Sequence, residues 1–321
     1  MDLRLGAAAG GPGGGEPLGP AAAARAARLL WVRSRREATS WLVGGYASAF
    51  RGGGVEFEEL RPYTPGDDVR AIDWNATARS GEPWVKRFRE ERAHTVLVLL
   101  DVSASMAFGS GQAKLASAAY AAALVAAAAG RAGDRVGLAL FSDSLRSALP
   151  PARGALHGWR LVRSIARESL RAGGATELGL AAGWALGAAR RRALVVLLSD
   201  FRDPALARAV ASGGSSPLAA LAERHELVSI VVEDPRERAL AAAGTLRLVD
   251  PERGGAPRVL GTGARRRARY AAVAEARRVA LRHRLRSEGA DVLALSTAED
   301  PLRALARFFR TRVDRRRRAW R

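Results

Sequence analysis

The sequence predicts an α/β protein with a doubly wound, mostly parallel sheet over residues 93–312, preceded by a small β-rich attachment over 35–92. Three observations lead to this fold class. From His94 onward, short apolar runs of strand length alternate with longer helical patterns. The runs are apolar throughout rather than at alternate positions, which indicates strands covered on both faces, as in parallel sheets. The chain has 321 residues, which is enough for a large core.

The predicted elements follow one another in a regular order. The expected strands are HTVLVLLD (94–101), DRVGLALFS (134–142), ALVVLLSDF (193–201), ELVSIVVED (226–234) and ADVLALST (290–297). Helices are expected at 111–133, 155–170, 175–191, 218–225, 268–289 and 300–312. Residues 236–262 interrupt this alternation, and GTLRLVDPERGG (244–255) within them has the pattern of a hairpin.

The two ends of the chain have a different character. Residues 1–34 are expected to be disordered or weakly helical. Residues 1 to about 20 are rich in glycine, proline and alanine, which predicts disorder, and residues 21–35 have the pattern of a short basic helix. Residues 35–92 contain the turn signals GGG, RPYTPGDD and SGEP between short apolar runs, which predicts a β-rich subdomain. Residues 313–321 are expected to form an exposed basic tail.

Composition and charge narrow the function classes. There are no cysteines, which excludes a disulfide framework, a thiolate zinc site and a cysteine nucleophile. The formal charge is +20, but few aromatic residues stand among the arginines, so no specific nucleic-acid partner is expected. No apolar run reaches the about 18–20 residues that span a bilayer, and the N-terminus lacks the signal-peptide pattern. We therefore expect a cytoplasmic protein without a transmembrane segment.

Small oxygen-bearing side chains follow the predicted strands. Asp101, Ser103 and Ser105 come at alternate positions after the first strand of the sheet. Thr176 stands at a helix start in GGATEL, and Asp200 lies at the end of the strand ALVVLLSD. Ligands of open α/β sheets bind outside the carboxyl ends of the strands, where the strand order reverses. We therefore expect all five side chains at that edge.

These five side chains offer two carboxylates and three hydroxyls, all of them hard oxygen donors. A donor set with few charges suits Mg²⁺ or Mn²⁺, with waters filling the octahedron, and Ca²⁺ is a further option. The alternative is structural, because Asp and Ser after strands are common helix caps and Thr176 precedes an ordinary helix. The motif D-x-S-x-S is weak alone, and the whole set predicts a metal site.

Together, DVSASM, GGATEL and LLSDF resemble a von Willebrand factor A-type domain with a metal-ion-dependent adhesion site. This resemblance implies a Rossmann-like sheet with a Mg²⁺ site. It also implies that an acidic side chain from a protein partner completes the coordination. The implied metal-site residues are Asp101, Ser103, Ser105, Thr176 and Asp200.

The upstream segment carries a more specific resemblance. GGGVEFEELRPYTPGDDVRAIDWNATARSGEPWVKRFREER, which leads into LLDVSASM, is similar to the bacterial domain-of-unknown-function 58 family. The resemblance extends over roughly residues 35–312 and includes the later VDPERG and ADVLALSTAEDPLRALARFF. Members are often encoded beside MoxR-type AAA+ ATPases. The resemblance therefore implies an adaptor or chaperone-like role with such an ATPase as the partner.

The RPYTPGDD segment has two interpretations. Its prolines and glycine fix turns, and its acids stand near Arg61, Arg70 and Arg79. We expect semi-buried ion pairs that attach the β-rich region to the sheet, with Trp74 and Trp84 as packing residues. The alternative is a docking surface for a partner.

The favoured function is a non-catalytic, metal-dependent binding module. One alternative is a metal-dependent phosphohydrolase with Asp101 as nucleophile, which needs a second acid nearby and often a lysine for the phosphoryl group. The residue two after Asp101 is Ser103, and neither Lys86 nor Lys114 is expected near the site. No nucleotide-binding G-x-x-x-x-G-K-[ST] motif is present. The other alternative is nucleic-acid binding through the arginine excess.

Overall fold

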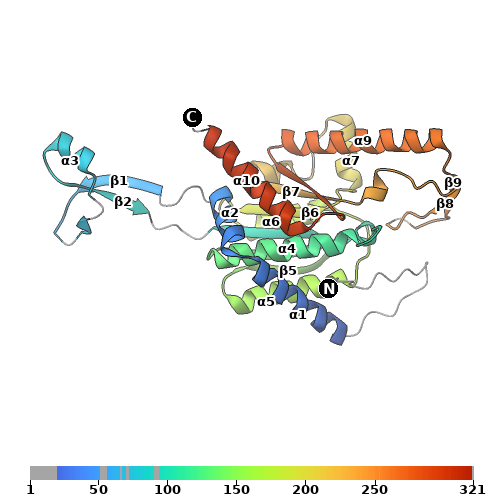
Figure 1. Cartoon of the computed structure of the whole chain (residues 1–321), viewed down its shortest axis with the longest axis horizontal. Helices are drawn as coiled ribbons and strands as arrows, with labels where there is room; N and C mark the ends of the chain where they lie inside the picture. Colours follow the sequence, from blue (N-terminus) through green and yellow to red (C-terminus); the bar gives the residue numbers. More distant parts are fainter. Residues whose placement is uncertain are drawn as a thin grey trace.

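Figure 1 shows a computed structural model of the chain, which describes residues 20–50, 56–65, 67–69, 72–89, 94–252 and 254–319. A six-stranded sheet lies at the centre of the body, in the order β10-β7-β6-β3-β4-β5. All neighbouring pairs are parallel except β4 and β5, so the predicted α/β fold with a mostly parallel sheet is confirmed. The strands are β3 (Thr95–Asp101), β4 (Arg135–Phe141), β5 (Leu145–Ala152), β6 (Leu194–Ser199), β7 (Glu226–Glu233) and β10 (Asp291–Ser296).

The edge strand β5 was not predicted. Its sequence LRSALPPA contains two prolines and alternates between exposed and partly buried residues. Proline cannot donate to a sheet ladder, which confines it to edges and bulges. Gly137 of β4 makes room for this strand, because a Cβ atom there would lie 3.1 Å from Pro151 Cγ and 2.9 Å from Leu97 Cδ2.

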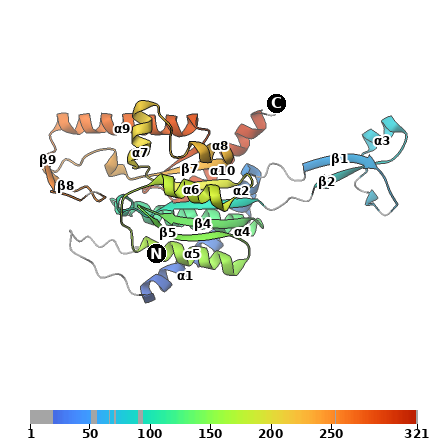
Figure 2. The same ribbon diagram turned by 180° about the vertical axis from the view of Figure 1, so that it is seen from behind.

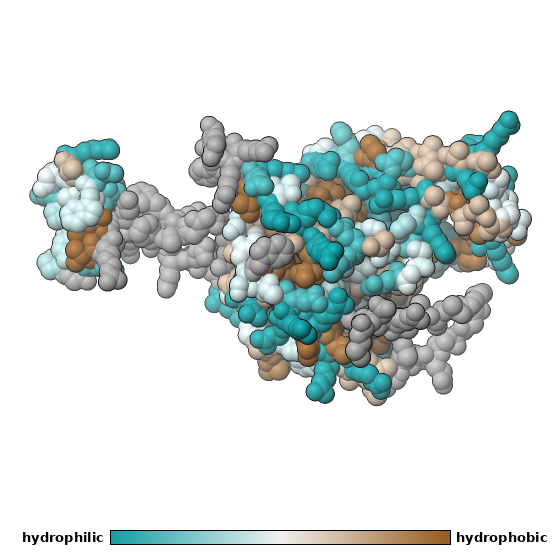
Figure 3. Space-filling model, in the orientation of Figure 1, coloured by the Kyte–Doolittle hydropathy of each residue, from teal (hydrophilic) through white to brown (hydrophobic). Residues whose placement is uncertain are grey.

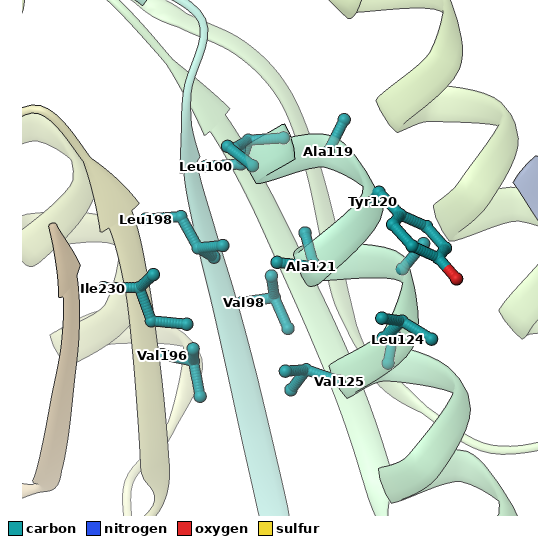
Figure 4. Close-up of a cluster of buried hydrophobic side chains, with 14 of the residues drawn as sticks. Val98, Leu100, Ala119, Tyr120, Ala121, Leu124, Val125, Val196, Leu198 and Ile230 are labelled. Atoms are coloured by element: carbon teal, nitrogen blue, oxygen red, sulfur yellow. The ribbon is translucent and has the colours of Figure 1, made fainter. Parts of the chain in front are cut away.

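One face of the sheet is covered by α4 (Lys114–Arg131), with α5 (Ala155–Ser169) and α10 (Pro301–Ala319) beside it. Figure 4 shows Val98 and Leu100 of β3 pointing toward Ala121 and Val125 of α4. Burying such side chains contributes about 1.5–3 kcal/mol each. The alanine-rich sequence of α4 lets the helix lie close to the strands.

The opposite face is covered by another group of helices. Leu97 and Leu99 alternate with Val98 and Leu100 along β3, so they point to this second face and join the apolar cluster around Phe141. Both faces of β3 are therefore buried, as its unbroken apolar run predicts. The covering helices are α6 (Leu178–Ala188), α7 (Pro204–Ser212), α8 (Ala219–Arg224) and α9 (Ala264–Ser287).

Two helices precede the sheet, in a region expected to be disordered, weakly helical or β-rich. They are α1 (Pro20–Glu37), which packs on α4 and α5, and α2 (Ser40–Phe50), which packs on α4 and α10. Residues 40–50 are therefore helical and belong to the body, which corrects the expected β-rich boundary at 35. Tyr46 is buried and donates a hydrogen bond to Asp134 Oδ2 at 2.8 Å. This tertiary packing outweighs the weak helix propensity of the glycine-containing segment.

The β-rich attachment is smaller than predicted and stands away from the sheet. It consists of β1 (Glu56–Pro62), the short helix α3 (Trp74–Ser80) and β2 (Trp84–Arg89), which we call the arm. Figures 1 and 2 show the arm extended from one end of the body. The ion pair of Arg61 and Asp67 at 2.6 Å lies within the arm rather than between the arm and the sheet. Gly66 and Arg70, part of the same expectation, lie outside the described residues.

The side chains of the arm also correct the expected packing roles. Trp74 is 69% exposed and so is not a packing residue, whereas Trp84 is half-buried. Figure 3 shows an apolar patch on the arm among hydrophilic side chains.

The remaining expectations have mixed outcomes. The predicted hairpin is present as β8 (Thr245–Leu248) paired antiparallel with β9 (Arg258–Gly261). The predicted basic tail is instead helical as far as Ala319, because α10 continues through it. Residues 1–19, 320 and 321 lie outside the described part of the chain. Across the described residues, no helix is both long and apolar enough to cross a membrane.

Candidate functional site

The two predicted carboxylates lie at the same edge of the sheet. Asp101 is the last residue of β3, and Asp200 directly follows the neighbouring parallel strand β6. The chain reverses its direction of winding between these strands, because β3 leads to β4 on one side while β6 lies on the other. A ligand of an open α/β sheet is expected at such a point.

Loops that follow these strands bring in the hydroxyl groups. Ser103 and Ser105 lie at a short 3₁₀ helix, η2 (Ala104–Ala107), and Thr176 lies just before α6. Backbone hydrogen bonds tie the two loops together, from Ala104 N to Gly174 O at 2.9 Å and from Gly173 N to Val102 O at 3.0 Å. Gly174 has φ +80° and leaves no room for a Cβ atom, which would lie 2.5 Å from Asp143 Oδ2.

Four of the five predicted residues form one buried hydrogen-bonded cluster. Thr176 Oγ1 lies 2.9 Å from Ser103 Oγ and 3.3 Å from Asp101 Oδ2. Ser103 Oγ lies 3.2 Å from Ser105 Oγ. The backbone N–H of Ser103 donates to Asp101 Oδ1 at 2.8 Å. The alternate spacing of Asp101, Ser103 and Ser105 therefore turns these side chains toward one another.

Asp200, the fifth residue, is held by cations. Lys114 Nζ donates to Asp200 Oδ2 at 2.5 Å and to Glu237 Oε1 at 2.8 Å. Arg202 reaches the same two acids, with its Nε 3.5 Å from Asp200 Oδ2 and its Nη2 2.9 Å from Glu237 Oε1. The expectation that neither lysine lies near the site is therefore wrong for Lys114, whose side chain is fully buried at the start of α4.

The electrostatics of Asp101 reflect burial and a like charge. Desolvation, followed by the charge of Asp200, raises the pKa of Asp101 to about 7, although hydrogen bonds from Ser199 and Ser103 oppose the shift. The Ser199 hydroxyl donates to Asp101 Oδ2 at 2.6 Å. Burial and the neighbouring charge of Asp200 thus both disfavour ionisation of Asp101.

This arrangement predicts how Asp101→Asn changes stability. A carboxyl whose pKa is raised on folding keeps a proton that the unfolded chain releases, so stability falls as pH rises from about 4 to about 7. An asparagine side chain does not titrate in this range, so the stability of the variant does not fall for this reason. In EDTA it should be more stable than wild type by about 1–3 kcal/mol at pH 8, with little or no advantage at pH 4.5. Urea unfolding at the two pH values measures the difference, and an equal difference at both would contradict the raised pKa.

The cluster contains more acceptor atoms than hydrogens. Thr176 has one hydroxyl hydrogen, yet oxygens of Asp101, Ser103 and Glu252 all lie within 3.3 Å of its Oγ1. A divalent cation satisfies such a surplus of lone pairs, and the atoms present are the oxygens that Mg²⁺ prefers. The residues therefore fit a hard cation. Within the described ranges, no three His, Cys, Asp or Glu side chains converge as a metal-binding group, so hydroxyls dominate the donor set.

Sequence reasoning missed four residues around the site. Ser199 stands directly before Asp200, so its position at the strand end was visible in LLSDF. Lys114 had a compositional signal, as one of two lysines in an arginine-rich chain. Glu237 lies in a 3₁₀ helix, η3 (Pro235–Glu237), just after β7, and Glu252 lies between β8 and β9, and no motif pointed to either residue.

Comparison with known proteins identifies the family. A family model described as "Protein of unknown function DUF58" matches residues 59–280. The chain belongs to the DUF58 family. Uncharacterized proteins of Mycobacterium tuberculosis and Mycobacterium bovis are 32% identical over 293 residues, which cover 90% of this chain and 89% of theirs. An uncharacterized protein of Mycobacterium avium is 36% identical over 123 residues, 38% of this chain and 68% of its own length.

Solved structures show weaker similarity to this DUF58 chain. An aerotolerance-related membrane protein from Bacteroides fragilis is 16% identical with a TM-score of 0.40, covering 70% of this chain and 100% of that one. The PilB minor pilin from Streptococcus sanguinis is 15% identical with a TM-score of 0.35, covering 74% of this chain and 65% of that one.

Proposed function

We propose that this DUF58 protein is a non-catalytic, metal-dependent protein-interaction module. A divalent cation, Mg²⁺ or else Mn²⁺ or Ca²⁺, binds at the carboxyl edge of the sheet, and an acidic side chain of a protein partner completes its coordination. The observation that carries this proposal is the buried oxygen cluster around Thr176, which has more lone pairs than hydrogens. The proposed metal-site residues are Asp101, Ser103, Ser105, Thr176 and Asp200.

The geometry gives these residues distinct roles in the proposal. Asp101, Ser103 and Ser105 offer oxygens from one loop, and Thr176 offers a hydroxyl from the facing loop. Asp200 adds a second carboxylate, whose Oδ2 already binds Lys114. The side chains of the site therefore do not fully neutralise the charge of a divalent cation, which favours coordination by a further carboxylate from outside. This is the behaviour that a von Willebrand factor A-like adhesion site requires.

The proposed partner is a MoxR-type AAA+ ATPase, for which the chain acts as an adaptor or chaperone-like component in the bacterial cytoplasm. Support for this partner comes from the upstream RPYTPGDD segment and its family resemblance. The exposed Trp74 on the arm supplies a second surface that an assembly could cover. Metal and partner should bind cooperatively, since each supplies charge that the other needs.

The first test is metal binding by serine variants. Ser103→Ala/Ser105→Ala removes two oxygen donors and should weaken Mg²⁺ or Mn²⁺ binding at least about tenfold, with the fold preserved. The matched control is Ser147→Ala/Ser164→Ala, which removes another serine pair, 2.7 Å apart, between β5 and α5. Calorimetric titration of each protein with the metal gives the affinities. Equal affinities in both double variants and wild type would contradict the site.

The second arm of the test concerns the partner. A MoxR-type ATPase is titrated into the chain in Mg²⁺ and again in EDTA. Binding in Mg²⁺ that is lost in EDTA and in Asp101→Ala supports the bridged mechanism. Equal affinity in both buffers would show that the metal does not take part in the interaction.

One observation favours the phosphohydrolase alternative. The buried ammonium of Lys114 lies beside Asp200 at the carboxyl edge, where phosphoryl chemistry often uses a lysine. Against it, the ammonium already binds two carboxylates, and both oxygens of Asp101 accept hydrogen bonds. Turnover of a phosphate monoester by the purified chain, abolished by Asp101→Asn, would favour the hydrolase over the binding module.

A further inference from the structure

The β8–β9 hairpin delivers a third carboxylate to the edge of the sheet. Glu252 lies in its turn, and its Oε1 accepts a hydrogen bond from Thr176 Oγ1 at 2.9 Å. The turn is ordered by Asp250, which accepts from Glu252 N through its side chain and from Gly254 N through its carbonyl, both at 3.0 Å. Figures 1 and 2 show the hairpin at the end of the body opposite the arm. Glu252 therefore approaches the site from outside the sheet.

The position of this carboxylate is unusual for so basic a chain. The protein has 52 Lys and Arg residues against 32 Asp and Glu residues. Nevertheless, in the part of the chain that the structure describes, Glu252 forms no ion pair with either type of cation, and its side chain instead faces a hydroxyl that Asp101 and Ser103 also approach. A partly buried carboxylate next to a second acid is unfavourable unless a cation joins them.

We propose that Glu252 is a metal ligand supplied by the chain itself, and that it holds the coordination position which the partner's acidic side chain takes over. This inference rests on the proposed function, because it assigns an occupant to the open position of that metal site. Thr176 connects the two roles. Its hydroxyl belongs to the metal site, and its contact with Glu252 places the carboxylate at the outer side of the oxygen cluster.

The hairpin is suited to a reversible contact. Each of its strands has four residues, and they pair with one another outside the central sheet. An isolated two-stranded hairpin is only marginally stable, and segments of this kind open at low cost. Glu252 can therefore leave while the sheet and the remaining ligands stay in place.

Two consequences follow for binding. With Glu252 in place, the cation gains a carboxylate at the oxygen cluster in addition to that of Asp101, so it binds more tightly than it would without Glu252. A partner's carboxylate must displace Glu252, so its apparent affinity is reduced by the fraction of protein in the closed arrangement. The hairpin therefore strengthens metal binding and lowers the apparent affinity of the partner.

Mn²⁺ alone tests the first consequence. Glu252→Gln keeps an oxygen acceptor for Thr176 but removes the charge, and it should weaken Mn²⁺ binding by about 5–10-fold, the ordinary size of a coupling between neighbouring groups. Water should fill the vacated position, so the water-proton relaxation rate per bound Mn²⁺ should rise. Glu223→Gln is the matched control, since it makes the same substitution at an exposed residue of α8, which precedes β7 and lies away from the carboxyl edge. It should change neither quantity appreciably.

Acetate tests the second consequence. Added to the Mn²⁺-loaded proteins at constant ionic strength, it should lower the relaxation rate of Glu252→Gln at concentrations that leave wild type unchanged. Unchanged Mn²⁺ affinity and relaxation in Glu252→Gln, with normal binding by wild type, would overturn the inference and leave the metal site standing. Failure of wild type itself to bind Mn²⁺ would overturn both.

Discussion

Replacing Arg312 with methionine is expected to lower the free energy of unfolding by about 3–5 kcal/mol. Arg312 is 7% exposed, on α10, and its guanidinium pairs with Glu226 at the start of β7 and Asp291 at the start of β10. Its Nε donates to Ala49 O on α2 at 3.0 Å. Methionine preserves the apolar stem of the side chain but leaves two acids without their shared cation.

The control for this substitution is Arg315→Met on the same helix. Arg315 reaches Asp291 at 3.6 Å, but its side chain is 66% exposed. Exposed pairs of this kind contribute about 0–1 kcal/mol. Urea unfolding of the three proteins gives the comparison. Similar losses in both variants would show that burial of the Arg312 network adds nothing to the stability of the helix.

Lys114→Met is expected to have an effect of similar size, about 3–5 kcal/mol in metal-free buffer. The Lys114 side chain is fully buried and that of Asp200 is 2% exposed, so the variant leaves a buried carboxylate beside Asp101 without its principal cation. If a divalent metal occupies the site, it supplies positive charge at the same place. Saturating Mg²⁺ should therefore restore part of the lost stability in Lys114→Met.

Arg202→Met is the matched control, because Arg202 contacts the same two acids from a more exposed position, with 38% of its side chain accessible. Its loss should be about 1 kcal/mol or less. Thermal unfolding in EDTA and in Mg²⁺ separates the two variants. A Lys114→Met protein as stable as wild type in EDTA would mean that Asp200 does not depend on the lysine.

The parts of the fold that could be predicted are those in which local pattern and burial agree. The apolar runs of β3 and β6 identify strands that are buried on both faces. Asp101 ends β3 and Asp200 directly follows β6, so the ends of these two strands determine the positions of both acids. The loop positions of Ser103 and Ser105 follow from the same strand end. Because β3 and β6 pair in parallel, these residues then lie at the same edge of the sheet.

The missed features depend on long-range packing. A short helix at 21–35 was expected and is present within α1, but the burial of Ala27 and Leu30 and the packing of α1 on α4 and α5 had no signal in the composition. Lys114 was not expected near the site, whereas the path of the chain from β3 into α4 brings its ammonium to Asp200. Glu252 depends on where a hairpin outside the sheet happens to lie, which no local pattern specifies.

The proline pair in β5 limits how the molecule can assemble. β5 forms one border of the central sheet and pairs only with β4 there. Pro150 and Pro151 lack the N–H groups through which another chain would extend the sheet. Pairing with an added strand is thereby disfavoured at residues 150 and 151 of this border. A partner at this part of the molecule would be held by side chains and loops, so its binding and release need not change the pairing of the sheet.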